Sequence, residues 1–487
     1  MKKNLLASLG FWILIANALY AQVAAKKTAT PSAQRSAGTT VAETSPIDLV
    51  ALDKELAGLV AERGLAGASV AIMDNGQVLL ARGYGKASLV SGEPVTPETM
   101  FNIGSVTKQF TTASILLLAQ DGKLSVDDKV AKYYPSLTDA GNITLLDLMG
   151  HLSGYPDYYP LDFVDERLLK TASADEIIQR YATGKLDFPP RSRYSYSNTG
   201  FIILGRVVEK VSGQPFGEFV KRRILVPLRM THTAFLPAPG TAGFATGYIS
   251  FGLSPLEPAM HEVKDWLYAA GGLASTPSDL ARWDLALVEG RVLGPKYYKI
   301  MTTPQMLADG RTTRYGCGIG VRTTPEGETI LAHSGAVSGF LAENYIIPRT
   351  KSAVVVLLNS EESGAMNALH AKLVSALVPE NAGVPKVAGP PALDAAKAMF
   401  RSLQAGQVDR NSLGEEFSHY LTAERLARAA AALRPLGEPS DAKAGNLTER
   451  GGMEVSRIVF SFGGSSVAAS MFRSADGKIQ QFLLTRQ

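Results

Sequence analysis

Ser105 and Lys108 are the first residues whose types and spacing could support chemistry. They lie three positions apart at the start of a stretch with apolar residues at helical spacing, so both would face the same side of a helix. A serine hydroxyl becomes a good nucleophile when a base takes its proton, and lysine can be that base if burial lowers its pKa from about 10.4. The same spacing is also typical of a helix cap followed by a solvated lysine.

Tyr196 and Asn198 form the second feature, just before a predicted helix over 201–211. In extended backbone, residues two apart point to the same side. A tyrosine beside a cationic lysine can relay a proton, and an asparagine amide can fix that lysine and bind a substrate carbonyl. The alternative is a turn that leads into the helix, with Asn198 as its cap.

The third feature is the run Ala-His-Ser-Gly-Ala at 332–336, which ends a strand-like segment. Gly335 permits close approach of another backbone. An edge strand here could pair with an extended substrate, and the amide of Ala336 could form an oxyanion hole with that of Ser105. A lone histidine beside a glycine, such as His333, is otherwise a common turn residue.

Together the three features, in the order Ser-x-x-Lys, Tyr-x-Asn and x-x-Gly, resemble the motif set of the penicillin-recognising serine enzymes. Residues 48–380 are similar to the family of class C β-lactamases, D-alanyl carboxypeptidases, D-aminopeptidases and related esterases. Two further phrases resemble that family, His-Leu-Ser-Gly-Tyr-Pro at 151–156 and Gly-Gly-Leu-Ala-Ser-Thr at 271–276.

The resemblance implies a role for each residue. Ser105 would be the nucleophile, Lys108 the base or proton relay, and Tyr196 the general base and later the acid. Asn198 would orient Lys108 and the substrate amide, and the amides of Ser105 and Ala336 would form the oxyanion hole. Whether Lys108 or Tyr196 is the primary base stays open at this point.

His333 stands where β-lactamases of this kind have the lysine of Lys-Thr-Gly. An imidazole is mostly neutral at about pH 7.5, whereas lysine offers a permanent charge to a substrate carboxylate. We expect this difference to weaken β-lactam binding by roughly 1.5–3 kcal/mol, or about ten- to a hundredfold. With His333 and Gly335 as substrate-binding residues, the resemblance favours D-amino peptides, peptidoglycan-like compounds or small esters, with weak or no β-lactam turnover.

Composition and motif content limit the other possibilities. The 487 residues are 46% hydrophobic and 19% charged, with a net charge of +4, and no long basic run indicates a nucleic-acid partner. The six histidines are scattered and there is one cysteine, so we expect neither a metal nor a cofactor. The absence of a Gly-x-Ser-x-Gly elbow in the sequence argues against an α/β-hydrolase fold.

The first 21 residues have the pattern of a signal peptide: two lysines, an apolar run, and a cleavage site after Ala21. We therefore expect a periplasmic or secreted protein with no stable membrane anchor after cleavage. Residues 22–44 are rich in alanine, threonine, serine and lysine, and we expect them to form a flexible leader.

Residues 45–380 are predicted to form one serine hydrolase domain. A helix is expected from Ser45-Pro46 to Gly64, then a hairpin around Asp74-Asn75-Gly76, then a mainly helical region over 105–289. Strands are expected at 315–321, 330–333, 344–347 and 352–358, followed by a helix at 364–378. The fold class is α/β (α+β), a β-lactamase-like antiparallel sheet flanked by N- and C-terminal helices, with a large helical insertion.

Residues 381–393 contain Asn, Gly and Pro in a pattern typical of a linker. Beyond it we predict a small α+β module over 394–487, with helices at 395–403 and 423–433 and strands at 456–462, 466–472 and 479–484. The module has no catalytic constellation, and its partner is unknown.

The sequence therefore predicts an exported serine hydrolase that acts on a small-molecule or peptide substrate through an acyl-enzyme. The alternative is a non-catalytic or single-turnover protein that binds penicillin or cell-wall peptides.

Overall fold

The computed structural model describes residues 47–159, 166–250, 254–324, 327–377, 384–445 and 447–486. The chain divides into two compact units, unit 1 up to Leu377 and unit 2 from Val378 onward, and each is described by itself. The predicted signal peptide and leader lie outside the described residues.

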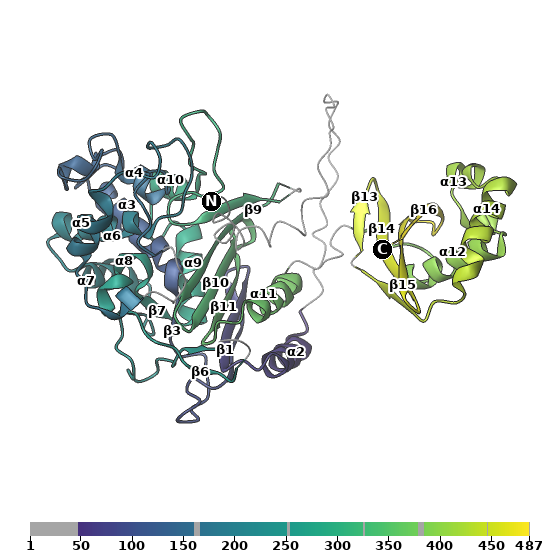
Figure 1. The fold of residues 1–487 in the computed structure, drawn as a ribbon, viewed down its shortest axis with the longest axis horizontal. Coiled ribbons are helices and arrows are strands. Elements are labelled where there is room, and N and C mark those ends of the chain that lie inside the picture. The colour runs from purple at the N-terminus through teal and green to yellow at the C-terminus, as the bar shows by residue number, and fades with distance from the viewer. Residues whose placement is uncertain are drawn as a thin grey trace, which may run out of the picture. The chain divides into compact units, whose positions relative to one another are not determined.

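Unit 1 is built on a six-stranded antiparallel sheet with the order β2-β1-β11-β10-β9-β8 (Figure 1). The central strand β11, with the sequence Ser-Ala-Val-Val-Val-Leu-Leu, is buried at every position, as expected for a β-branched strand covered on both faces. The strands of this sheet are β1 (Gly67–Asp74), β2 (Gln77–Gly85), β8 (Gly320–Thr323), β9 (Thr329–Val337), β10 (Phe340–Ile347) and β11 (Ser352–Leu358).

The first hairpin and the opening helix have the predicted types. Asn75 and Gly76 both have positive φ (49° and 76°), which is the backbone of the tight turn that joins β1 to β2. The opening helix α2 (Leu49–Glu62) is capped by Asp48, whose carboxylate accepts from the amides at 50 and 51. The helix therefore begins at Leu49 and not at the predicted start, Ser45-Pro46, because the Asp48 carboxylate satisfies the first free amides of the helix. Ser45 and Pro46 lie outside the described residues.

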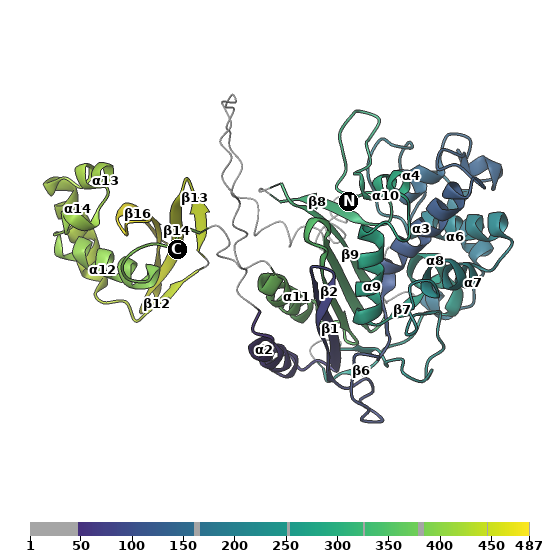
Figure 2. The ribbon, with the colours of Figure 1, turned by 180° about the vertical axis from the view of Figure 1, so that it is seen from behind.

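Helices cover both faces of the sheet (Figures 1 and 2). On one face, leucines of α2 and α11 (Ser363–Leu377) pack against valines of β1 and β11. On the other face lie α9 (Pro277–Val288) and the helical insertion. The insertion contains α3 (Thr107–Gln120), α4 (Leu145–Met149), α5 (Ala174–Ala182), α6 (Asn198–Ser212), α7 (Phe216–Val220) and α8 (Tyr268–Gly271), and α10 (Pro295–Thr302) follows α9.

The helix α3 runs through the centre of unit 1 and is buried from Thr107 to Ala119. Its N-terminus adjoins a small sheet of β3 (Phe101–Asn102), β7 (Leu273–Ser275) and β4 (Ala234–Phe235), and a two-stranded sheet pairs β5 (Tyr248–Ile249) with β6 (Glu257–Pro258). This mixture of an antiparallel sheet and a helical insertion confirms the predicted fold class.

One predicted strand is wrong in its first half. The prediction placed a strand at 315–321, but β8 begins at Gly320. Gly318 has φ of 68°, and a methyl group on it would lie 2.5 Å from the carbonyl oxygen of Lys108. The chain therefore bends tightly over α3 before it enters the sheet.

Unit 2 is an antiparallel sheet packed against helices (Figure 1). Its strands are β12 (Asp441–Ala444), β13 (Thr448–Arg450), β14 (Met453–Phe462), β15 (Ser465–Arg473) and β16 (Ile479–Arg486), and its helices are α12 (Ala392–Ala405), α13 (Glu415–Tyr420) and α14 (Ala423–Leu433). The predicted strands and helices are present, and the short polar elements β12, β13 and α13 were missed.

Part of the predicted linker belongs to unit 2. The amide of Ala388 donates to Ala475 O (2.9 Å), and Arg473 donates to Pro390 O (2.7 Å). Residues 381–383 lie outside the described residues.

Across the described part of the chain, no helix combines the length and apolarity needed to cross a bilayer.

Candidate active site

Ser105 lies in a 3₁₀ turn, Gly104–Val106, that leads directly into α3. Gly104 has φ of 48°, so this turn needs a residue without a side chain just before the serine. Ser105 is half-buried, and its Oγ lies 2.9 Å from Lys108 Nζ, one helical turn along. The predicted nucleophile and base are therefore in hydrogen-bond contact.

Lys108 is fully buried, and its Nζ contacts three oxygens. Besides Ser105 Oγ, these are Asn198 Oδ1 at 2.7 Å and Ala270 O at 2.8 Å. Burial lowers the pKa of Lys108 to about 7, and the negative charge of Asp157 opposes that shift. Near neutral pH the amine is therefore a mixture of its charged and neutral forms.

Tyr196 donates its hydroxyl to Ser105 Oγ at 2.8 Å. Burial raises the pKa of Tyr196 well above its usual value, so the phenol stays protonated. The ring of His151 packs against the ring of Tyr196, with 4.2 Å between centroids, and His151 Nδ1 accepts from the amide of Ser197 at 3.1 Å. His151 has φ of 59°, a left-handed backbone that is uncommon for a residue other than glycine.

Asn198 is the first residue of α6, and Ser197 before it has extended backbone (φ −147°, ψ 118°). Ser197 therefore holds the cap position that the alternative interpretation gave to Asn198. The Asn198 amide joins two titratable groups, because Oδ1 accepts from Lys108 and Nδ2 donates to Asp157 at 3.1 Å.

The strand β9 passes directly beside the nucleophile turn. A methyl group on Gly335 would lie 2.0 Å from Ile103 O and 3.1 Å from the amide nitrogen of Ser105, so only glycine fits. A methyl group on Gly104 would lie 2.7 Å from the amide nitrogen of Ala336. The backbone of Ala336 therefore adjoins the serine turn, as an oxyanion hole would need.

The strand pairings leave the outer edge of β9 open at this point. Pairing with β8 ends at Ala332, and Val337 closes a two-residue turn with Phe340. Since hydrogen-bonded and non-hydrogen-bonded pairs alternate along antiparallel strands, Ala336 and Leu341 form a non-hydrogen-bonded pair. The amide of Ala336 therefore points away from β10.

His333 has both ring nitrogens in contact with the protein. Nδ1 lies 2.6 Å from Ser334 O and Nε2 lies 2.7 Å from the hydroxyl of Tyr315. The carbonyl can only accept, so Nδ1 carries the proton and Nε2 accepts from the tyrosine. Burial, reinforced by the charge of Lys108, lowers the pKa of His333 to about 4, so the ring is neutral. His333 is buried and bonded within the protein at both ring nitrogens, so direct binding of a substrate through Nε2 would require Tyr315 to release it.

Three groups at the site were not predicted to have a functional role: the carboxylate of Asp157, the ring of His151 and the carbonyl of Ala270. His151 is the first residue of the family-like motif at 151–156, and Asp157 comes directly after that motif. Ala270 comes directly before the second such motif, at 271–276. Their location in or next to these two motifs was the one signal in the sequence that could have indicated a role. A backbone carbonyl has no sequence signature of its own.

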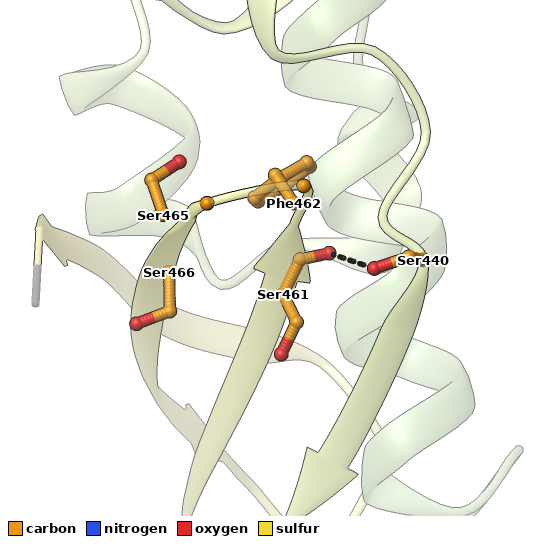
Figure 3. A pocket seen from close by; sticks show the side chains of 7 residues that line it. Ser440, Ser461, Phe462, Ser465 and Ser466 are labelled. Carbon is orange, nitrogen blue, oxygen red and sulfur yellow. Dashed lines mark hydrogen bonds between the residues drawn. The ribbon is translucent and has the colours of Figure 1, made fainter.

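A hollow on unit 2 has no comparable chemistry (Figure 3). It lies at the turn between β14 and β15 and is lined by hydroxyl, glycine and phenylalanine residues, Ser440, Ser461, Phe462, Gly463, Gly464, Ser465 and Ser466. Ser440 donates to the carbonyl of Ser461 at 3.1 Å. No lysine, histidine or acidic residue lines this hollow, so its serines lack a base. Among the described residues of both units, no group of three or more His, Cys, Asp or Glu is placed to hold a metal.

The similarity to known proteins covers the region of the chain that contains this site. The family model described as Beta-lactamase matches residues 52–378. The penicillin-binding protein 4* of Bacillus subtilis is 28% identical over 308 residues, which cover 60% of this chain and 68% of that protein. A D-aminopeptidase of Brucella canis is 29% identical over 307 residues, covering 62% of this chain and 58% of that enzyme. The match therefore spans less than two thirds of the D-aminopeptidase.

Solved structures show the same fold. The D-amino acid amidase from Ochrobactrum anthropi SV3, complexed with D-phenylalanine, has a TM-score of 0.57 at 25% identity and covers 67% of this chain and 99% of that chain. The octameric penicillin-binding protein homologue from Pyrococcus abyssi has a TM-score of 0.56 at 24% identity. Its match covers 90% of this chain and 99% of that chain, so it extends into unit 2.

Proposed function

The chain belongs to the beta-lactamase family of serine hydrolases, and we propose that it is an exported enzyme that cleaves amide or ester bonds through an acyl-enzyme on Ser105. The family match and the D-aminopeptidase and D-amino acid amidase homologues support hydrolysis. Export rests on the signal-peptide pattern of residues 1–21.

The observation that carries the proposal is the set of partners around Lys108 Nζ. A neutral amine has two N–H donors and one lone pair. The carbonyl oxygens of Asn198 and Ala270 can only accept, so they use both donors. The lone pair is left for the third neighbour, Ser105 Oγ, at 2.9 Å. This arrangement suits Lys108 to take the proton of the serine hydroxyl.

In the acylation step, the Ser105 proton moves to Lys108 while Oγ bonds to the substrate carbonyl carbon. The carbonyl π electrons move to oxygen, and the amides of Ser105 and Ala336 stabilise the oxyanion. The tetrahedral intermediate then collapses and expels the leaving amine or alcohol. A water molecule later attacks the ester and releases the acid by the same proton transfers in reverse.

The geometry favours Lys108 as the base and Tyr196 as the acid. The Tyr196 phenol is protonated and donates to Ser105 Oγ, so it cannot accept that proton in the resting enzyme. It can give its proton to the leaving group, and the Lys108 ammonium then reprotonates the phenolate. The net result is transfer of the serine proton to the leaving group.

We propose substrates with a D-amino acid, such as D-amino peptides, peptidoglycan-like fragments or D-amino acid amides, together with small esters. The printed names of the relatives include a D-aminopeptidase and a D-amino acid amidase. The neutral, internally bonded His333 offers no cation for a β-lactam carboxylate. We therefore expect weak or no turnover of β-lactams.

A second candidate is a protein that acylates once with penicillin or a cell-wall peptide and does not turn over. The resemblance to penicillin-binding protein 4* favours it. Steady-state assays with D- and L-phenylalanine amide, a short-chain ester and nitrocefin separate the two. We expect sustained release of product from the D-amide and the ester. A burst of one equivalent without turnover would favour the binding protein, and no reaction of any kind would contradict both candidates.

A further inference from the structure

Asp157 contacts the site on the side of Asn198 away from Lys108. Its Oδ1 accepts from the amide nitrogen of Asn198 at 2.9 Å, from Asn198 Nδ2 at 3.1 Å and from the amide of Tyr159 at 3.2 Å. Its Oδ2 lies 3.3 Å from Asn198 Nδ2. The carboxylate therefore accepts hydrogen bonds from backbone and side chain at once, and its position does not depend on a contact with the lysine.

These contacts indicate that Asp157 carries a negative charge. Its hydrogen-bond partners among the described residues are all N–H groups, which need an acceptor. A protonated carboxyl would keep Oδ1 as an acceptor, but an O–H on Oδ2 would face the Asn198 Nδ2 donor 3.3 Å away. Burial raises the pKa of Asp157, while the backbone amide of Asn198 and the charge of Lys108 act in the opposite direction.

The buried ammonium of Lys108 needs such a counter-ion. After it takes the serine proton, the cation lies in a fully buried position, where an unpaired charge is costly. The other titratable groups that face it, among the described residues, are Tyr196, His151 and His333. Burial raises the pKa of Tyr196 and lowers the pKa of both histidines, so all three are neutral. Asp157 is the described carboxylate that acts on Lys108.

On the basis of the proposed function, we infer that Asp157 is a positioning residue that acts through the Asn198 amide to stabilise the protonated form of Lys108 during acylation. The chain of contacts is Asp157 carboxylate, Asn198 amide, Lys108 amine and Ser105 hydroxyl. The amide is polarised by both neighbours, since its N–H₂ faces an anion and its oxygen faces a cation. Asp157 thereby controls how readily Lys108 holds the proton that it takes from the serine.

The test is the pH dependence of acylation by an uncharged fluorophosphonate, followed as the second-order labelling rate of the full-length protein. In the wild type we expect the rate to rise with pH through a midpoint of about 7, because only the neutral amine is a base. An anion favours the charged amine, so its removal in Asp157→Asn should lower the midpoint by about one pH unit. The plateau rate should fall by about tenfold or more, because the cation formed in acylation loses its partner.

Two variants control for structural effects. Glu262→Gln removes a carboxylate that accepts from the Tyr159 hydroxyl and the Ser338 amide and that has no contact with Asn198, so its midpoint should stay at the wild-type value. Asp157→Glu keeps the charge, and its midpoint should lie closer to the wild type than that of Asp157→Asn. Asp157→Ser also removes the charge and provides the same test if Asp157→Asn is not recovered folded.

A slower Asp157→Asn with an unmoved midpoint would overturn the inference and leave Asp157 a structural role. An equal shift in Glu262→Gln would also overturn it, because any loss of negative charge near the site would then suffice. Both outcomes leave labelling of Ser105 in the wild type intact. Absence of wild-type labelling is a separate result that defeats the proposed function itself and removes the basis of this inference.

Discussion

Unit 1 buries Lys108 and unit 2 buries Arg473, and the two cations have opposite surroundings. Arg473 donates to Glu454 Oε1 at 2.8 Å and to Pro390 O at 2.7 Å. Arginine is a permanent cation in proteins, and both partners of Arg473 can only accept. Lys108 instead can lose a proton near neutral pH and lies beside a hydroxyl that can supply one. A buried basic side chain thus supports chemistry when it can gain and lose a proton next to a nucleophile. A buried side chain that stays charged, such as arginine, instead holds strands and chain segments together.

The largest effect should follow from removing the Lys108 amine. Lys108→Ala takes away the base while Ser105 and Tyr196 remain, and we expect kcat/KM for a D-amino acid amide to fall by roughly 10⁴-fold or more. Circular dichroism provides the check that the fold is retained. A folded Lys108→Ala protein within tenfold of wild-type activity would refute the role of the amine.

Tyr196→Phe should have the next largest effect, because it removes the proton donor to the leaving group while the ring still packs on His151. We expect a loss of roughly 10²- to 10⁴-fold on amides. The loss should be smaller on esters with good leaving groups, which need little protonation. Rates for matched amide and ester substrates measure this, and equal losses on both would contradict the assignment of Tyr196 as the acid.

In unit 2, Glu454→Gln should reduce stability without removing a catalytic group. The substitution leaves the Arg473 cation, which is 2% exposed, without its counter-ion. We expect a loss of about 3–5 kcal/mol in the free energy of unfolding of this unit, measured by urea denaturation. The double variant Glu454→Leu with Arg473→Met should recover much of that loss, and a single variant as stable as the wild type would show that the pair is not structural.

The smallest effect should come from adding a positive charge at position 333. His333→Lys would introduce an amine where the β-lactamases of this family have one, and we expect penicillin acylation to become faster by up to about tenfold. The gain should stay below the hundredfold limit expected from sequence, because the new amine would be partly buried and near Lys108. An unchanged acylation rate would show that charge at this position does not limit β-lactam recognition.

The sequence identified the parts of this molecule that have strong local signals. The Asn75-Gly76 turn requires positive φ at both positions, and Ser105 and Lys108 share a helix face by spacing alone. Asp157 and the Ala270 carbonyl were missed, because their contacts join segments far apart in the chain and depend on the folded structure. The internal bonding of His333 was missed for the same reason, since Tyr315 lies on the bend before β8.

The most direct test of the central claim is to locate the covalent adduct after treatment with a fluorophosphonate at pH 8. Intact-mass and peptide mass spectrometry should show one adduct per chain, on the peptide that contains Ser105, and none in Ser105→Ala. An adduct on a different residue, or labelling that persists unchanged in Ser105→Ala, would contradict the account.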